Sequence, residues 1–173
     1  MKKYKSLVIL FLINLIFLSF DSMAQNDLDE RAIYIVRHAE KEINKDDPPL
    51  TKEGEKRAEK LREILKEKDI KSVYSSDKKR TRHTIIPFAD EKGLHINIYD
   101  TDEHGELVTK IQEEEGNVVI IGHSNTVHHI INLLIGGQIM EELDESDYEN
   151  IFVVYINEEG GTRLEKKTYS DFE

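Results

Sequence analysis

The sequence contains no cysteine among its 173 residues. This absence excludes a disulfide framework, a thiolate metal site, a cysteine nucleophile and a lipid-modified cysteine anchor. Basic residues are outnumbered by acidic ones, with 24 Lys and Arg against 35 Asp and Glu, and the formal net charge is −11. We therefore do not expect the chain to bind nucleic acid through a broad basic surface.

The first 24 residues have the order of a secretory signal peptide. Lysines near the N-terminus precede the mostly apolar residues 7–20, and the small residues Ser22 and Ala24 then frame a cleavage site. As a helix this apolar run would span about 21 Å, which is short of the ~30 Å hydrocarbon core of a bilayer. We expect cleavage after Ala24, secretion across the inner membrane to the periplasm or cell exterior, and no stable membrane insertion. An uncleaved membrane anchor is the alternative.

In the remaining chain, short β-branched runs alternate with longer amphipathic segments. Thr51 is a suitable helix N-cap, and Gly93 and Gly136 are suitable helix ends. Strands are expected at 32–36, 73–74, 94–99 and 118–121, helices at 51–68, 77–91, 106–115 and 126–135, and a terminal hairpin at 151–156 and 162–169. This alternation predicts one α/β domain over residues 25–173, a three-layer sandwich in which helices flank a mainly parallel central sheet.

Several chemically versatile side chains follow directly after the predicted strands. Arg37 and His38 come after the first strand, Arg80 follows the second, and His123 and Ser124 follow the fourth. Because ligands of open α/β sheets bind at the carboxyl ends of the strands, we expect these side chains to converge on one edge. Ser124 also opens a helix, whose free backbone N–H groups favour an anion.

This set of side chains suits the chemistry of phosphoryl transfer. Two guanidinium groups match the oxygens of a phosphoryl group, and they disfavour a proton on a neighbouring imidazole. A neutral histidine can attack phosphorus, while a second histidine donates a hydrogen bond to the phosphoryl oxygens. No metal or other cofactor is needed for this chemistry. A metal site built from His123, His128 and His129 fits the usual ligand spacing poorly.

Four motifs in this order resemble those of the histidine phosphatase (phosphoglycerate-mutase-like) superfamily. The motifs are IYIVRHAEK, PLTKEGEKRA, VYSSDKKRTRHT and VVIIGHS. The resemblance implies that His38 is the phosphorylated nucleophile and that Arg37, Arg80 and His123 form the phosphate pocket. It also implies that Asn44 lies on the substrate side.

The departures from the family pattern indicate a small, open member. Ala39 replaces a frequent glycine, no aspartate follows His123, and residues 99–107 leave no room for a large cap. The resemblance places the general acid in the loop after the third strand, where Asp102 and Glu103 are the candidates. We expect an exported, metal-independent phosphatase acting on a small phosphoester or on a phosphorylated protein side chain. A non-catalytic phosphate-binding module with the same pocket is the alternative.

Overall fold

The computed structural model describes residues 30–43 and 46–172. The predicted signal peptide, residues 1–24, and the candidate substrate residue Asn44 lie outside the described residues. Residues 31–156 and 162–172 form one compact unit. No helix in this described part is both long and apolar enough to cross a membrane.

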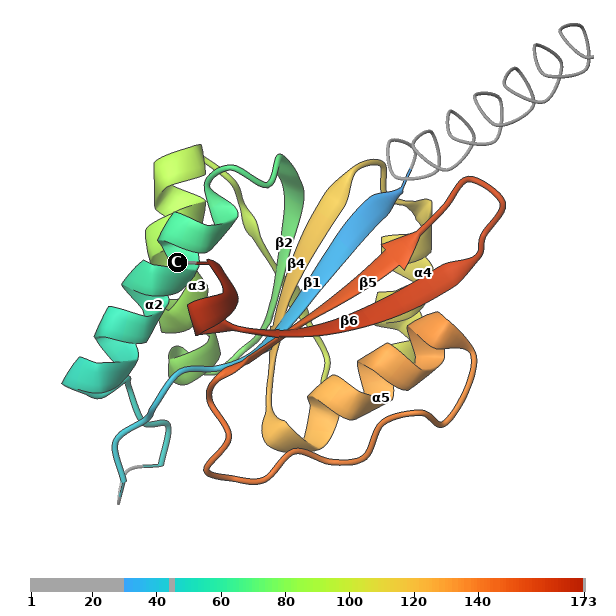
Figure 1. The fold of residues 1–173 in the computed structure, drawn as a ribbon. Coiled ribbons are helices and arrows are strands. Elements are labelled where there is room, and N and C mark those ends of the chain that lie inside the picture. Colours follow the sequence, from blue (N-terminus) through green and yellow to red (C-terminus); the bar gives the residue numbers. More distant parts are fainter. Residues whose placement is uncertain (1–29, 44–45, 173) are drawn as a thin grey trace, which may run out of the picture. The chain divides into compact units, whose positions relative to one another are not determined.

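A mixed sheet forms the centre of this unit (Figure 1), and its described strands lie in the order β3–β2–β4–β1–β5–β6. The strands are β1 (Arg31–Arg37), β2 (Ile70–Ser76), β3 (Ile96–Tyr99), β4 (Asn117–Gly122), β5 (Asn150–Ile156) and β6 (Thr162–Thr168). The neighbouring pairs β1–β4, β2–β4 and β2–β3 are parallel. β5 runs antiparallel to both β1 and β6. The predicted α/β sandwich with a mainly parallel sheet is confirmed.

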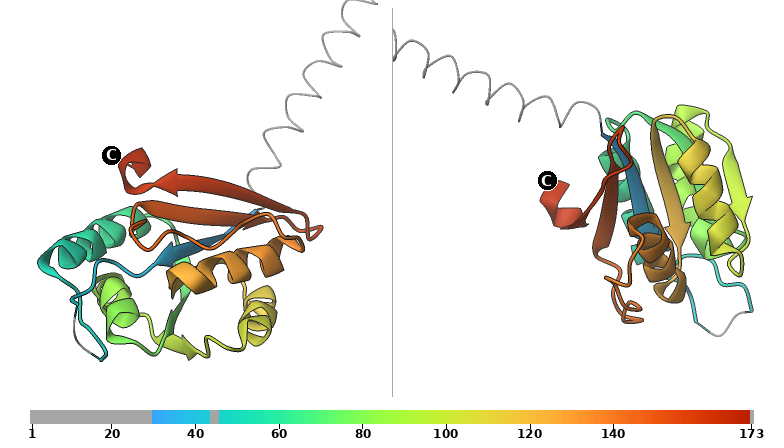
Figure 2. Two further views of the ribbon diagram at one scale, coloured as in Figure 1. Left: turned by 90° about the horizontal axis from the view of Figure 1, so that it is seen from below. Right: turned by 90° about the vertical axis from the view of Figure 1, so that its right-hand side faces the viewer.

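Helices cover both faces of the sheet (Figure 2). The helices are α2 (Lys52–Leu65), α3 (Lys79–Lys92), α4 (His104–Glu113) and α5 (Ser124–Ile135). α2 and α3 pack on one face, where Leu61 and Phe88 join Val36 in one apolar core. α4 and α5 pack on the other, where Ile111 and Ile130 join a second core. Each residue of β1 from Ala32 to Arg37 is buried, as expected for a strand covered on both faces.

Local capping explains several helix boundaries. The Thr51 hydroxyl accepts a hydrogen bond from the backbone N–H of Gly54 at 3.1 Å, and Gly93 ends α3 with a φ of 64°. α5 begins two residues earlier than the expected range 126–135, because His123 is its N-cap and the Thr126 hydroxyl accepts from the backbone N–H of His123 at 2.9 Å. The C-terminal hairpin is present as predicted, with β5 and β6 paired along their length.

Candidate active site

The site lies at the carboxyl ends of the two central strands β1 and β4. The helix after β1 covers one face of the sheet, and the helix after β4 covers the other. Open α/β sheets bind ligands at the strand ends where the helices change face in this way. Arg37 pairs with Gly122 across the two strands, and the backbone N–H of His38 donates to the Gly122 carbonyl at 2.9 Å. The ends of both strands are therefore fixed to each other at the site.

His38 is held as a neutral imidazole with one free nitrogen. Its side chain is buried, and Nδ1 lies 2.8 Å from the carbonyl oxygen of Ala39. Because a carbonyl only accepts hydrogen bonds, Nδ1 carries the proton and Nε2 keeps its lone pair. Burial lowers the pKa of His38 to about 3, with smaller contributions from His123, Arg37 and Arg80. His38 therefore presents an unprotonated Nε2 at neutral pH, as a nucleophile requires.

His123 stands beside His38, with ring centroids 5.3 Å apart. Its Nε2 lies 2.8 Å from the hydroxyl of Ser76, and its Nδ1 is buried without a hydrogen-bond partner. Burial, together with the nearby charge of Arg80, lowers the pKa of His123 to about 4. When the Ser76 hydroxyl donates to Nε2, the proton of the neutral ring is on Nδ1. His123 then offers that N–H to a bound anion.

Arg80 comes to the site in the first turn of α3, just after β2. Its Nε is buried without a hydrogen-bond partner, and its Nη1 lies 4.0 Å from Asp47 Oδ1. Burial lowers the pKa of Arg80, but a guanidinium remains charged at physiological pH. The side chain therefore keeps donors available for a phosphoryl group.

Arg37 is almost fully enclosed by the connection between α5 and β5. Its Nη1 donates to the carbonyl oxygens of Asp144 at 3.0 Å and Asp147 at 3.2 Å. Its Nη2 donates to Glu145 Oε2 at 3.1 Å, and its guanidinium carbon lies 4.2 Å from the centre of the Tyr148 ring. Nε is buried without a partner. These contacts fix the guanidinium in one orientation.

The sequence comparison covers the part of the chain that contains Arg37, His38 and Arg80. Residues 33–103 match the model of the histidine phosphatase superfamily, branch 1. Over this segment the chain is similar to the histidine phosphatase superfamily. The segment ends before β4, and the fold itself brings His123 to the other three residues. Among curated proteins, no sequence matches this chain.

Solved histidine phosphatase structures share the fold. The chain is similar to the protein histidine phosphatase SixA complexed with tungstate, at 19% identity and a TM-score of 0.64, over 82% of this chain and 99% of that one. It is similar to a putative α-ribazole-5'-P phosphatase from Escherichia coli K-12, at 15% identity and a TM-score of 0.65, over 80% of this chain and 96% of the other. Mycobacterial glucosyl-3-phosphoglycerate phosphatase with inorganic phosphate gives 14% identity and a TM-score of 0.61, over 80% and 96% of the two chains.

The two predicted general acids lie in the loop between β3 and α4. Asp102 lines a cavity together with His104 and His129. Glu103 precedes α4 as its N-cap residue, and its side chain is exposed. The assignment of Asp102 or Glu103 as the acid stays a prediction. Within the described ranges, no group of three or more metal-ligating side chains is arranged to hold a metal ion.

Three residues at the site were missed by sequence reasoning. Ser76 contacts His123, and Tyr148 stacks on Arg37. Glu145 accepts hydrogen bonds from both Arg37 and Ser124. Glu145 and Tyr148 lie 108 and 111 residues from Arg37 along the chain, in a polar connection without a recognisable pattern. Ser76 could have been found from the sequence, because it ends a strand whose carboxyl end faces the site.

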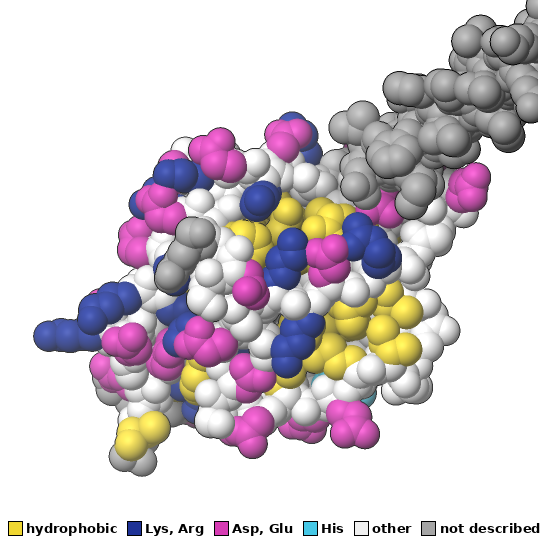
Figure 3. All heavy atoms as spheres, viewed as in Figure 1, with side chains coloured by type: hydrophobic (Ala, Val, Ile, Leu, Met, Phe, Trp, Pro, Cys, Tyr) yellow, Lys and Arg dark blue, Asp and Glu magenta, His cyan; other side chains and the backbone are white. Residues whose placement is uncertain are grey.

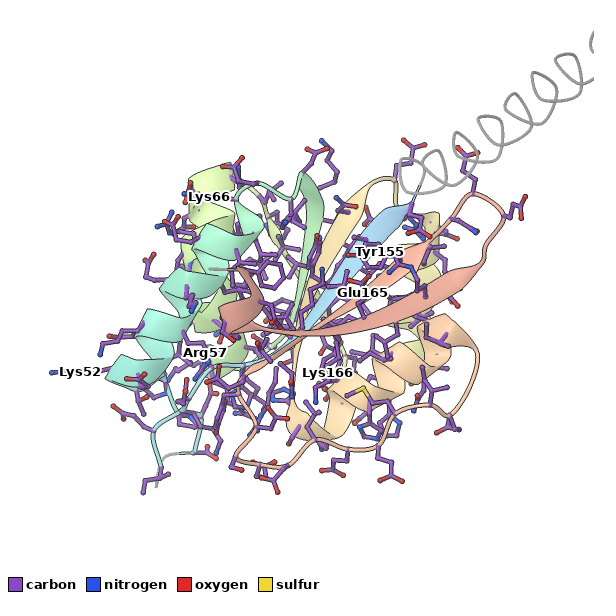
Figure 4. All side chains as sticks on the ribbon, in the orientation of Figure 1. Lys52, Arg57, Lys66, Tyr155, Glu165 and Lys166 are labelled. Atoms are coloured by element: carbon purple, nitrogen blue, oxygen red, sulfur yellow. The ribbon has the colours of Figure 1, made fainter. Side chains whose placement is uncertain are left out.

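Ion pairs of Arg57 connect the two segments that flank the site, one after His38 and one after Tyr148. Arg57 on α2, labelled in Figure 4, donates to both carboxylate oxygens of Glu40 and to Glu149 at 2.7 Å. Glu40 follows two residues after His38, and Glu149 lies one residue after Tyr148. The guanidinium of Arg57 also lies 5.0 Å from the centre of the Tyr169 ring. Arg57 therefore ties both flanking segments to α2.

Proposed function

We propose that this chain is a metal-independent phosphatase that works through a phosphohistidine intermediate on His38. The observation that carries the proposal is the hydrogen bond from His38 Nδ1 to the Ala39 carbonyl, which leaves Nε2 free beside His123. The family match to residues 33–103 and the shared fold of solved histidine phosphatases support the same activity. The signal-peptide pattern supports export of the enzyme from the cytoplasm.

In the first step, His38 Nε2 attacks phosphorus, a P–N bond forms, and the bond from phosphorus to the leaving group breaks. Arg37, Arg80 and His123 hold the three phosphoryl oxygens and stabilise their charge in the transition state. In the second step, water attacks the phosphohistidine, the P–N bond breaks, and inorganic phosphate leaves. His38 returns to the neutral form that its burial favours.

We propose one of two kinds of substrate. Either its leaving group needs little protonation, or Asp102 or Glu103 protonates the leaving group. The similar proteins include a protein histidine phosphatase, a putative α-ribazole-5'-P phosphatase and a glucosyl-3-phosphoglycerate phosphatase. We accordingly propose a phosphorylated protein side chain, phosphohistidine included, or a small phosphoester as the substrate. A phosphohistidine substrate has an imidazole leaving group, for which an acid from the loop after β3 is not required.

Hydrolysis of an aryl phosphate in the presence of a chelator tests the activity. We expect steady turnover by the chain, loss of turnover in His38→Ala, and full turnover in the control His95→Ala, whose side chain is exposed. Loss of activity in the chelator, followed by recovery when one metal ion is added, would contradict the metal-free mechanism. Phosphate binding without turnover would support the non-catalytic alternative instead. The intact mass of the chain from the exported fraction separately tests cleavage after Ala24.

A further inference from the structure

Glu145 places a carboxylate among the anion-binding groups of the site. Its Oε2 accepts a hydrogen bond from Arg37 Nη2 at 3.1 Å, and its Oε1 accepts one from the Ser124 hydroxyl. Glu145 also lies within electrostatic range of Arg80 and of the His123 ring. One carboxylate therefore contacts or faces four of the groups predicted to bind phosphate.

The donors that Glu145 uses are the ones that a phosphoryl group would need. The Nε and Nη2 of Arg37 point N–H bonds along one edge of the guanidinium, an arrangement that matches two oxygens of a phosphoryl group. On this edge Nε has no partner, whereas Nη2 is bonded to Glu145. Ser124 is the first residue of α5, at the helix end that favours anions.

We propose that Glu145 is a specificity-determining residue, an internal anion that a phosphoryl group must displace from Arg37 and Ser124. This inference rests on the proposed function, because it assumes that the same groups bind the substrate's phosphate. A doubly charged phosphoryl group gains more from the two arginines than a singly charged carboxylate does. The site therefore excludes weak monoanions and admits phosphoryl dianions.

Burial and charge make this exchange feasible. The Glu145 side chain is 73% exposed, while that of Arg37 is 2% exposed. Glu145 can therefore turn toward solvent without uncovering the core, and Arg37 stays oriented by the Asp144 and Asp147 carbonyls. The hydrogen bond from Ser124 and the charge of Arg37 lower the pKa of Glu145. At neutral pH its carboxylate is charged and repels a phosphoryl group that arrives beside it.

Calorimetric titration with inorganic phosphate near neutral pH tests the inference. Glu145→Gln removes the charge and keeps the shape and an acceptor oxygen. We expect this variant to bind phosphate about tenfold more tightly than the unmodified chain, since a close like charge is removed. Glu141→Gln is the matched control, because it removes the same charge from an exposed residue of the same connection. We expect its affinity to stay within about twofold of the unmodified chain.

The possible results separate this inference from the proposed function. Equal or weaker phosphate binding by Glu145→Gln, with clear binding by the unmodified chain, overturns the inference and leaves the phosphate pocket intact. Equal tightening in Glu145→Gln and Glu141→Gln also overturns it, because the effect would then be one of net charge. Phosphate binding by none of the three chains contradicts the pocket itself, and the role of Glu145 with it.

Discussion

At the residue scale, the chemistry of the site depends on which nitrogen of each histidine carries the proton. The Ala39 carbonyl fixes the proton of His38 on Nδ1, and the Ser76 hydroxyl contacts Nε2 of His123. Both rings are buried beside two guanidinium groups, which keeps them neutral. In the proposed mechanism, His38 is the nucleophile and His123 is a hydrogen-bond donor, although the residue type is the same.

Ser76→Ala tests the orientation of His123. The substitution leaves a buried ring nitrogen without its partner, which typically costs about 1–3 kcal/mol. We expect kcat to fall at least about tenfold, with a smaller change in KM, because the His123 donor acts mainly in the transition state. Ser75→Ala is the control, since Ser75 is equally buried but its hydroxyl donates only to the Ser76 carbonyl. An equal loss in both variants would contradict a specific role for Ser76.

Arg80→Lys tests the guanidinium fork. Lysine keeps the charge but lacks the planar pair of donors, so we expect kcat/KM to fall roughly 10²–10³-fold, as for other lost transition-state donors. Arg82→Lys, on the same helix and paired with Asp77 near the surface, should change kcat/KM by less than about twofold. Steady-state kinetics with an aryl phosphate measure both. A loss below about threefold in Arg80→Lys would place Arg80 outside the pocket.

At the element scale, two strand ends and two helix starts hold the site together. β1 and β4 end side by side, while the packing of α2 against the chain after His38 positions that segment. A Cβ atom added at Gly54 in α2 would lie 2.2 Å from the Glu40 carbonyl oxygen. Glycine at this position therefore permits a backbone approach that other residues would block.

Gly54→Ala tests this close approach. Because a backbone atom cannot move aside as a flexible side chain can, we expect a loss of about 1–3 kcal/mol in the free energy of unfolding, with reduced activity. Gly105→Ala in α4 is the control, because an added Cβ there meets nothing within 4 Å. This control should be neutral or stabilising by up to about 1 kcal/mol. Denaturant unfolding measures both, and equal effects would contradict the packing argument.

The elements explain what the sequence could and could not predict. The alternation of β-branched runs with capped helices predicted the sheet, and the strand-end rule brought Arg37, His38, Arg80 and His123 together. The strand order required knowledge of which runs pair, which no local pattern contains. Glu145 was missed because it lies in an acidic connection where neighbouring carboxylates look equivalent. Only the fold distinguishes it, through its contacts with Arg37 and Ser124.

At the scale of the whole molecule, an acidic chain contains a basic pocket. The formal net charge is −11, and acidic side chains interspersed with basic ones cover much of the face shown in Figure 3. Acidic side chains also line the lower side of that view, where Figure 1 places the connection between α5 and β5. A net negative charge of this size disfavours binding of large polyanions.

The buried histidines make stability depend on pH. The pKa values of His38 and His123 in the folded chain are about 3 and 4, below the value of about 6.5 for an unfolded chain. As the pH falls below 6.5, the unfolded chain binds protons that the folded chain does not, so stability decreases. Between pH 7 and 5 we expect a loss of up to about 2 kcal/mol per histidine.

Denaturant unfolding at several pH values measures this dependence. His123→Asn should have a shallower decline in the free energy of unfolding than the unmodified chain, since it removes one depressed histidine. His95→Gln, which changes an exposed histidine, should keep the full decline. The same decline in all three chains would show that groups other than His123 carry the effect.

The central claim is that His38 forms a covalent bond to phosphorus, and rapid quenching during turnover with labelled substrate tests it most directly. A P–N bond is labile in acid and stable in base, unlike a phosphoserine ester. We predict an acid-labile, base-stable label on the peptide that contains Arg37 and His38, and no such label in His38→Ala. Label on Ser75, Ser76 or Ser124, or steady hydrolysis by His38→Ala, would contradict the account.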